Sequence, residues 1–546
     1  MNPDNTREEA VALLKQGKTE QARELCSALC HGSHDNPQNW MLLTTAQMQL
    51  GELDAAISSI RQALSLGGYS PQAVSTLAAL LLHQGETAES DACFEILYSH
   101  NFPAADAHRL AANILRQLGD YANAIIQYQR AVTQDPNHFP ARSELAAMLQ
   151  ENKQFDAALA HYEKLMDLRA DYTTTHIGMG ICLASTKRFD EAASTLKKAV
   201  QIDSSNTEAY FHLGETYQLM CRYPDAADCY RHALQLCPDA AAVHGSLARA
   251  LRNQGDTQGA LACLQRALEL EPENATAHHE LGICLYDERN TAAAKESFRN
   301  ATRINPSMAQ SRFFLGMIYA QDGDEAKAQE QFSEACRLWP YLGCFVDSFR
   351  YSQNSSTTAH YLSNRKQLFE FSVTHANNSG LFLEFGVYHG ASINMIARLT
   401  SNTVHGFDTF QGLPADWVVS DGQREDIEPA GSYTTHGIIP EAPDNVQFHV
   451  GTFEASLPGF CQEHKELVSL MNIDCDLYDS TKIIFDHLGG QISEGTIIVF
   501  DDYFCFPGWR DHEAKAFWEY IEQADLAYEY LAFNFFTGQV VVRITS

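Results

Sequence analysis

The sequence predicts a multidomain protein: an all-α solenoid of helix pairs, followed by an α/β domain with a mostly parallel, seven-stranded sheet and a terminal antiparallel hairpin. Two observations lead to this fold class. A helix-turn-helix pattern returns every 34 residues through residues 1–340, and short apolar runs alternate with helical segments in the remaining part. Helix pairs at such a period bury their apolar faces by stacking, and strand–helix alternation is typical of doubly wound sheets.

Three columns of residues define the repeat. One position of the period is occupied by Gly17, Gly51, Gly85, Gly119, Lys153, Lys187, Cys221, Gly255, Arg289 and Gly323. Five residues later stands alanine, replaced by serine in the third copy, and seven residues before the first column stands a small residue. Small side chains at both places let two helices approach closely. We count ten repeats, with the terminal copies divergent, as is common for caps.

These columns closely resemble those of the tetratricopeptide repeat family. The resemblance implies a right-handed superhelix with a concave groove that typically binds peptides or protein segments. We therefore expect a protein or peptide partner in the groove. The alternative is a purely structural use of the repeats, as a spacer or a dimerisation arm.

Composition excludes several kinds of partner and location. Asp and Glu number 69 against 38 Lys and Arg, a formal charge of −31, so nucleic acid and anionic membranes are poor partners. The 14 cysteines form no CxxC pair, and we expect them to be small buried residues in a reducing compartment. The start lacks the apolar core of a signal peptide, and no stretch of 18 apolar residues occurs. The sequence predicts a soluble cytoplasmic protein without membrane insertion. Its oligomeric state stays open, and a homo-oligomer is one possibility.

The part after residue 340 is predicted to begin with a linker at 341–365 and to continue as an α/β domain at 366–546. A helix is expected at 366–375. Strands are expected at 381–385, 404–407, 446–450, 467–473, 496–500, 528–533 and 539–544. The last two are close enough in sequence to form a hairpin at one edge of the sheet.

Glycines and an acid follow the first two strands. "LFLEFGVYHGAS" places Glu384, Gly386 and Gly390 where a strand ends and a helix begins. Glycine there lets the backbone turn tightly and lets a ligand approach it. The second strand ends at Asp408, and a carboxylate in that place can accept hydrogen bonds from the hydroxyls of an adenosine ribose. The alternative for Asp408 is a cap of a turn or helix.

Four carboxylates follow the fourth and fifth strands. Asp474 and Asp476 stand on one strand end, and Asp501 and Asp502 stand on its neighbour. Adjacent strands lie roughly 5 Å apart, so these groups would repel one another unless a cation lay between them. Oxygen ligands favour a hard ion, most plausibly Mg²⁺. The alternative is that these acids cap helices and bind Lys or Arg.

The motifs together resemble the macrocin O-methyltransferase (TylF-type) family of class I methyltransferases. The run 384–392, Asp408 with "GLP", "GTFEASLP", "DCDLYDSTK" and "DDY" carry the resemblance, which covers residues 360–545. It implies Mg²⁺ held by Asp474, Asp501 and Asp502. We choose Asp474 as the general base, since it would touch the metal and face the acceptor. S-adenosylmethionine would be held by Glu384, Gly386, Tyr388, Gly390, Ser392, Asp408 and Gly451. Less favoured bases are Asp476, His436, His449 and His512.

The resemblance implies a metal-dependent O-methyltransferase. The methyl group of S-adenosylmethionine would pass to a hydroxyl of a sugar, a glycan or a glycosylated natural product, and the repeats would recruit a partner or an acceptor carrier. Two alternatives stay open: a scaffold with a non-catalytic domain that senses S-adenosylmethionine, and a protein or peptide methyltransferase. The polar segment 417–443 is expected to be a structureless loop that serves as a lid. Residues 504–509 are a candidate aromatic wall for the acceptor.

Overall fold

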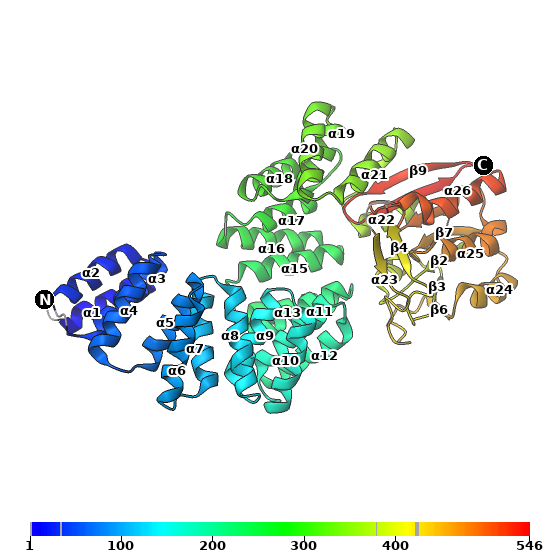
Figure 1. Ribbon diagram of the computed structural model, residues 1–546. Coiled ribbons are helices and arrows are strands. Elements are labelled where there is room, and N and C mark those ends of the chain that lie inside the picture. Colours follow the sequence, from blue (N-terminus) through cyan, green and yellow to red (C-terminus); the bar gives the residue numbers. More distant parts are fainter. Residues whose placement is uncertain (1–2, 33–34, 378, 421–424) are drawn as a thin grey trace. The chain divides into compact units, whose positions relative to one another are not determined.

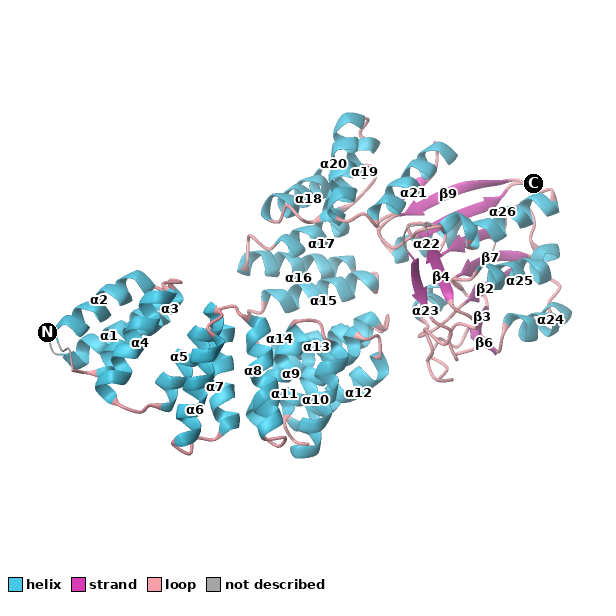
Figure 2. Ribbon diagram, viewed as in Figure 1, coloured by secondary structure: helices cyan, strands magenta, loops and turns pink. Residues whose placement is uncertain are grey.

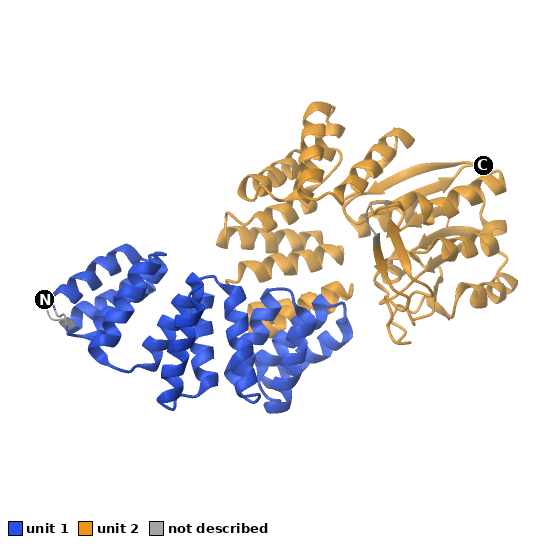
Figure 3. Cartoon of the chain, in the orientation of Figure 1, with its two compact units in different colours: residues 1–204 blue, residues 205–546 orange. Residues whose placement is uncertain are grey.

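The computed structural model describes residues 3–32, 35–377, 379–420 and 425–546. The chain divides into two compact units, residues 1–204 and 205–546 (Figure 3). The first unit holds helices α1 to α12. The second holds helices α13 to α20, helix α21 and the α/β domain (Figures 1 and 2). The second unit thus combines the last repeats with the domain that carries the predicted site.

Helices of the first unit pair as the period predicts, each odd-numbered helix packing on the even-numbered one that follows. Their bounds are α1 Pro3–Lys15, α2 Thr19–Gly32, α3 Pro37–Gln49, α4 Leu53–Gly67, α5 Pro71–Gln84, α6 Thr87–Ser99, α7 Ala104–Gln117, α8 Tyr121–Gln134, α9 Phe139–Glu151, α10 Phe155–Leu168, α11 Thr173–Ser185 and α12 Phe189–Ile202.

The repeats of the second unit follow the same plan. Their helices are α13 Thr207–Leu219, α14 Tyr223–Leu236, α15 Ala241–Asn253, α16 Thr257–Leu270, α17 Ala275–Leu285, α18 Ala292–Ile304, α19 Ala309–Gln321 and α20 Glu325–Leu338. Close packing explains the small residues. A Cβ on Gly214 would lie 2.7 Å from Tyr230, and one on Gly282 would lie 2.6 Å from Phe298. In these two pairs the second helix places a large ring there, so the first helix needs glycine.

The first column of the repeat forms the turn between the two helices of a pair. Gly85 and Gly119 have φ angles of +85° and +77°, in the left-handed region that glycine enters without steric cost. The same region is taken by the non-glycine residues Lys153, Lys187 and Cys221, with φ angles of +58°, +62° and +57°. The turn therefore keeps its geometry even where the glycine is replaced.

The ninth repeat departs from this plan. Helix α17 stops at Leu285, and Tyr286 after it is extended, with a ψ of 121°. Arg289 is not among the residues with positive φ. The loop that results carries Glu288, whose carboxylate accepts a hydrogen bond from the backbone N–H of Tyr361 at 2.6 Å and contacts Nδ1 of His360 at 2.6 Å. The irregular loop is thus joined to the first strand of the α/β domain.

The α/β domain contains one large sheet. Within the described residues its strand order is β1-β9-β10-β8-β7-β2-β3-β6. The strands are β1 His360–Tyr361, β2 Leu381–Phe385, β3 Val404–Asp408, β6 Val446–Val450, β7 Val468–Ile473, β8 Ile497–Phe500, β9 Tyr528–Asn534 and β10 Gln539–Ile544. β2, β3, β6, β7 and β8 run parallel, while β10 is antiparallel to both β8 and β9. The predicted parallel sheet with a closing hairpin is confirmed, and the two-residue strand β1 is added beside β9.

Helices cover both faces of this sheet. They are α22 Arg365–His375, α23 Ala391–Leu399, α24 Phe453–Glu463, α25 Tyr478–Leu488 and α26 Glu513–Ala524. Alternate residues of a strand point to opposite faces. Phe382 accordingly packs with Ile393 of α23, while Leu383 and Phe385 belong to the core with Phe485 of α25. This alternation leaves the carboxyl ends of the parallel strands as the open edge of the domain.

The segment 341–365, expected as a linker, contains helix α21 (Leu342–Ser355) and strand β1. Phe349 of α21 lies 5.8 Å from Phe332 of the last repeat and 5.5 Å from Phe535 after β9, measured between ring centroids. These residues belong to one hydrophobic core that runs from the last repeats into the sheet. The end of the array and the α/β domain are therefore packed together rather than tethered.

The segment 417–443 is not a structureless loop, contrary to the expectation. Strands β4 Trp417–Ser420 and β5 Glu425–Glu428 pair in antiparallel fashion, with Val418 opposite Ile427. Residues 421–424, which are part of the expected lid, lie outside the described residues.

Among the described residues, no helix is long and apolar enough to span a membrane.

Candidate active site at the carboxyl ends of the strands

A tight turn after strand β2 brings two strand ends together. Gly386 has a φ of +84°, and a Cβ on it would lie 1.7 Å from the backbone oxygen of Asp474 after β7. Gly390, with a φ of +79°, closes the turn directly before helix α23. Any side chain at Gly386 would push the ends of β2 and β7 apart, so the position requires glycine.

Asp408, the last residue of β3, holds this turn. Its Oδ2 accepts the backbone N–H groups of Val387 at 2.7 Å and Tyr388 at 2.8 Å, and its Oδ1 accepts the N–H of Phe410 at 2.7 Å. Tyr388 has a φ of +50°, which is costly for a non-glycine residue and needs support from its surroundings. These bonds use three of the roughly four acceptor positions of a carboxylate. Asp408, predicted as a ribose ligand, therefore uses most of its acceptor positions to order the turn.

Glu384 lies inside the domain, with no exposed surface. Its Oε1 accepts a hydrogen bond from the hydroxyl of Ser392 at 2.8 Å, while its Oε2 has no hydrogen-bond partner among the described residues. Burial raises the pKa of Glu384 to about 8. Gly451 lies at the same edge of the sheet, because its N–H donates to the backbone oxygen of Asp408 at 2.9 Å. The edge thus holds a buried carboxyl group with an unused acceptor atom.

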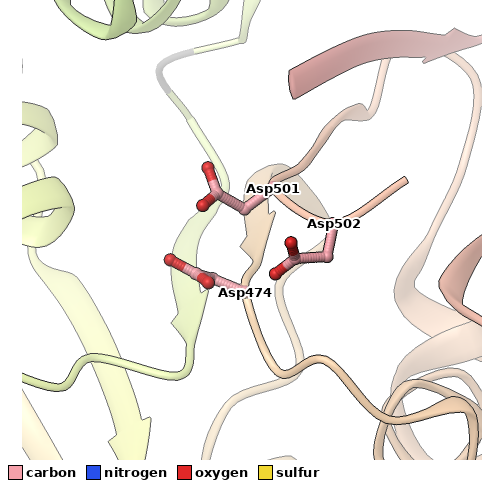
Figure 4. A group of neighbouring side chains, drawn as sticks. All are labelled: Asp474, Asp501 and Asp502. Atoms are coloured by element: carbon pink, nitrogen blue, oxygen red, sulfur yellow. The ribbon is translucent and has the colours of Figure 1, made fainter. Parts of the chain in front are cut away.

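Three carboxyl groups gather beside this turn. Asp474 follows β7, Asp501 and Asp502 follow β8, and one oxygen from each lies within 4.8 Å of the others (Figure 4). The sheet sets their position, since the N–H of Asp501 still bonds to the backbone oxygen of Ile473 at 2.9 Å. The structure therefore brings together the three residues predicted as metal ligands. Oxygen donors at this spacing fit a hard divalent cation.

Further acids surround this cluster, and burial disfavours their charged forms. Asp476 adopts a φ of +62°, and Glu513 at the start of α26 accepts the N–H of Cys475 at 3.3 Å. Burial, and then the neighbouring carboxylates, raise the pKa of Asp474 and Asp502 well above the ordinary value. Burial also raises the pKa of Asp476, to about 7. Such a group of like charges is stable only with protons or a cation bound.

Arg365, the first residue of α22, supplies one positive charge. Its Nη2 donates to both carboxylate oxygens of Asp501, at 2.9 and 2.7 Å, and the side-chain amide of Gln539 also donates to Asp501. The side chains of Arg365 and Asp501 are 19% and 13% exposed, so the ion pair is largely removed from water. Asp474 and Asp502 form no ion pair within the described part of the chain. Binding to arginine, the alternative for these acids, is thus observed for Asp501.

Sequence reasoning missed Arg365, Gln539 and Glu513. Arg365 stands 136 positions before Asp501, inside the segment expected as a linker, and no local pattern marks it. Gln539 begins β10 and Glu513 begins α26, positions where a polar residue needs no special explanation. Only the packing of α22, α26 and β10 around the ends of β7 and β8 reveals them.

A cavity of about 610 Å³ lies between α21 and the loop after β8. Tyr341, Asp347, Ser420, Phe506 and Trp509 are among its lining residues. Two members of the predicted aromatic wall, Phe506 and Trp509, therefore face a cavity. Trp509 is held by α21, because its indole N–H donates to Asp347 of that helix at 3.0 Å.

Two of the three histidines considered as bases, His449 and His512, have other contacts. His449 on β6 lies with Nε2 3.1 Å from Nδ1 of His405 on β3, and its ring stacks on Phe407 at 4.6 Å. His512 contacts the rings of Trp417 and Phe506 edge to face. Burial lowers the pKa of both His449 and His512. Both rings are thus part of the aromatic packing.

Family models match both parts of the chain. The model described as Methyltransferase domain matches residues 383–503, and the model described as Tetratricopeptide repeat matches residues 309–340. The C-terminal domain of cilia and flagella-associated protein 70 matches residues 95–314. No curated protein matches the chain.

Comparison with solved structures finds several proteins with partial similarity to this chain. YrrB, described as a TPR protein with an unusual peptide-binding site, is 26% identical, covers 33% of this chain and 92% of its own, and has a TM-score of 0.27. PilF of Pseudomonas aeruginosa is 19% identical, with coverage of 37% and 92% and a TM-score of 0.34. Yeast Tom70 is 14% identical, with coverage of 65% and 97% and a TM-score of 0.33. The family models, together with the fold, show that the chain joins tetratricopeptide repeats to a methyltransferase domain.

Proposed function

We propose that the chain is a metal-dependent O-methyltransferase that transfers the methyl group of S-adenosylmethionine to a hydroxyl of a sugar, a glycan or a glycosylated natural product. The observation that supports this most strongly is the position of the acidic cluster. Asp474, Asp501 and Asp502 lie within 4.8 Å of one another, and the backbone oxygen of Asp474 touches the glycine turn at Gly386. A place for a cation therefore adjoins a place where a ligand can approach the backbone.

The residues at the turn fit S-adenosylmethionine. The unused Oε2 of Glu384 is a buried acceptor that a cationic amine would satisfy, and the remaining acceptor position of Asp408 suits a ribose hydroxyl. Tyr388 and Gly451 border the same edge of the sheet. The cofactor carries its own activated methyl group, so the chain's part is to bind it and align it with the acceptor.

The acidic cluster fits Mg²⁺ by the chemistry of its donors, although Asp501 is shared with Arg365. A bound Mg²⁺ would lower the pKa of an acceptor hydroxyl and fix its position. Asp474 belongs to the cluster and stands beside the glycine turn, so we assign it the role of accepting the hydroxyl proton. Asp476, with a pKa of about 7, is the second candidate for that role.

The repeats are proposed to recruit the acceptor carrier or a partner enzyme. The last copies and α21 pack on the methyltransferase domain, so a partner bound to these last copies would stand at a constant distance from the site. The ion pair between Arg365 and Asp501 favours a second candidate function. An arginine already bound to Asp501 leaves less negative charge for a metal ion to neutralise, as would suit a scaffold whose domain senses S-adenosylmethionine without catalysis.

Calorimetry on the full chain tests the proposal. S-adenosylmethionine should bind with micromolar affinity, and turnover on glycan acceptors should require Mg²⁺ and disappear in EDTA. The double variant Asp501→Asn with Asp502→Asn should keep cofactor binding and lose metal-dependent turnover. Full activity of that variant would contradict the metal assignment, and cofactor binding without any turnover would favour the sensing scaffold.

A further inference from the structure

Loops of the seventh and eighth repeats reach the start of helix α22. A Cβ placed on Gly255 would lie 2.3 to 2.9 Å from three carbon atoms of the Lys366 side chain, so that side chain rests directly on the loop. Gln254 donates from its side-chain amide to the backbone oxygen of Tyr223 at 2.9 Å, which ties the two loops together. Lys366 follows Arg365 in the chain. The repeats therefore contact the residue next to the arginine of the acidic cluster.

Tyr223 lies in the same electrostatic environment as that arginine. Burial raises the pKa of the Tyr223 phenol, and the neighbouring Cys221, Arg365 and Asp501 also act on it. Tyr121 occupies the same position of the repeat in the first unit and is 55% exposed. Tyr223 is half-buried, as are Phe155 and Phe189 at the same position of their repeats. What distinguishes Tyr223 is the bond from Gln254 to its backbone oxygen and the charged groups of the acidic cluster that act on its phenol.

Arg365 and a divalent cation compete for one carboxylate. The guanidinium takes both oxygens of Asp501, and its charge opposes that of a metal ion bound among Asp474, Asp501 and Asp502. A metal ion therefore binds more tightly when Arg365 is absent or withdrawn from Asp501. Whatever holds Arg365 in place also limits the affinity for the metal.

We propose that the loops of the seventh and eighth repeats seat Arg365 against Asp501 and thereby set the divalent-cation affinity of the acidic cluster. The proposal rests on the metal site of the proposed function and adds a regulator to it. The repeats become part of the active site, and a ligand that shifts these two loops changes the affinity of the cluster for metal. Arg365, Tyr223 and Gly255 are positioning residues in this scheme.

The test is a titration of Mn²⁺ into the full chain. Binding is measured by calorimetry and by the electron paramagnetic resonance signal of the free ion. Arg365→Gln should tighten Mn²⁺ binding by about tenfold or more, because a close positive charge is removed from a partly buried site. Gly255→Ala and Tyr223→Ala should tighten it by about threefold to tenfold, since they loosen the seat of Arg365. Thermal melting by circular dichroism checks that each variant is folded.

Two matched controls separate this effect from damage to the repeats. Gly323 has the same φ of +81° as Gly255 and nothing within 4 Å of an added Cβ, so Gly323→Ala introduces the same backbone cost without the contact. Tyr121→Ala removes a tyrosine from the same position of another repeat. Both controls should leave Mn²⁺ affinity unchanged.

Each outcome decides between the two proposals. Mn²⁺ binding by the wild type with no change in Arg365→Gln would overturn the competition and leave the metal site intact. The role of the repeats would be overturned if Arg365→Gln bound Mn²⁺ more tightly while the repeat variants did not. In that case Gly255→Ala would have the same Mn²⁺ affinity as Gly323→Ala, and Tyr223→Ala would have that of the wild type. Absence of binding in the wild type and in every variant would overturn the metal site itself.

Discussion

Replacing Asp408 with alanine separates its two roles, as the group that orders the glycine turn and as a ribose ligand. The substitution removes the acceptor of three backbone N–H groups, those of Val387, Tyr388 and Phe410. A hydrogen bond to a charged group contributes about 1.5–3 kcal/mol. Because Asp408 is only partly buried, we take the lower end of that range for each of the three bonds and expect a local loss of roughly 4.5 kcal/mol.

Hydrogen exchange of the full chain measures this loss where it occurs. A tenfold change corresponds to about 1.4 kcal/mol, so the amides of these three residues should exchange about a thousand times faster in Asp408→Ala. S-adenosylmethionine affinity should fall at the same time, because Tyr388 no longer keeps its left-handed conformation. Asp416→Ala is the control, since Asp416 accepts a backbone bond from Ala430, outside the turn.

The reasoning is refuted if these amides exchange within about threefold of the wild type while cofactor affinity collapses, since a tenfold change already means 1.4 kcal/mol. Asp408 would then act on the cofactor alone. The opposite pattern, fast exchange with full affinity, would remove Asp408 from the list of ribose ligands and leave it as a purely structural residue.

Three further predictions concern the same domain. Glu384 binds its proton more tightly in the folded chain than in the unfolded chain, so its contribution to stability falls as pH rises from about 4.5 to about 8. Urea unfolding at pH 6 and at pH 9 should therefore show a smaller loss of unfolding free energy between the two pH values for Glu384→Gln than for the wild type. Gly386→Ala should abolish cofactor binding in calorimetry, because its Cβ would overlap the backbone oxygen of Asp474 at 1.7 Å, and retained binding would mean that β7 can shift. Phe536 stacks on Phe314 of the last repeat at 4.4 Å, so Phe536→Ala should cost about 2 kcal/mol in urea unfolding, half of the usual value for a fully buried ring. An unchanged midpoint would show that this contact adds nothing to stability.

Much of the fold follows from local pattern. Apolar periodicity and small residues define helix pairs, and the turn residues keep a left-handed conformation even at Lys153 and Cys221. The sequence does not distinguish Arg289 from those replacements, yet the first helix of its repeat, α17, ends early, at Leu285. The difference arises from the bond of Glu288 to strand β1, a tertiary contact between residues more than 70 positions apart. Such a contact leaves no trace in the period of the repeat.

The site was predictable to the extent that topology places strand ends together. Parallel strands in one sheet bring Asp474 and Asp501 to one edge whatever the surrounding helices do. The partners of these acids were not predictable in the same way. Arg365 reaches Asp501 only because α22 packs at that edge, and no spacing rule connects the two residues. The occupation of Asp408 by backbone donors likewise depends on the turn's three-dimensional shape.

The irregular loop of the ninth repeat restricts how this chain can change in length. Tandem repeats vary in number by duplication or loss of whole copies, and each such event shifts everything beyond it by one repeat. A copy gained or lost between Glu288 and residue 360 would carry the carboxylate away from the N–H of Tyr361 and leave strand β1 without that bond. The residues that meet α22 lie in the seventh and eighth repeats, so we expect the number of copies before them to vary more freely. We therefore expect homologues to differ in length at the amino-terminal side of the array and to keep its last four copies in register with the sheet.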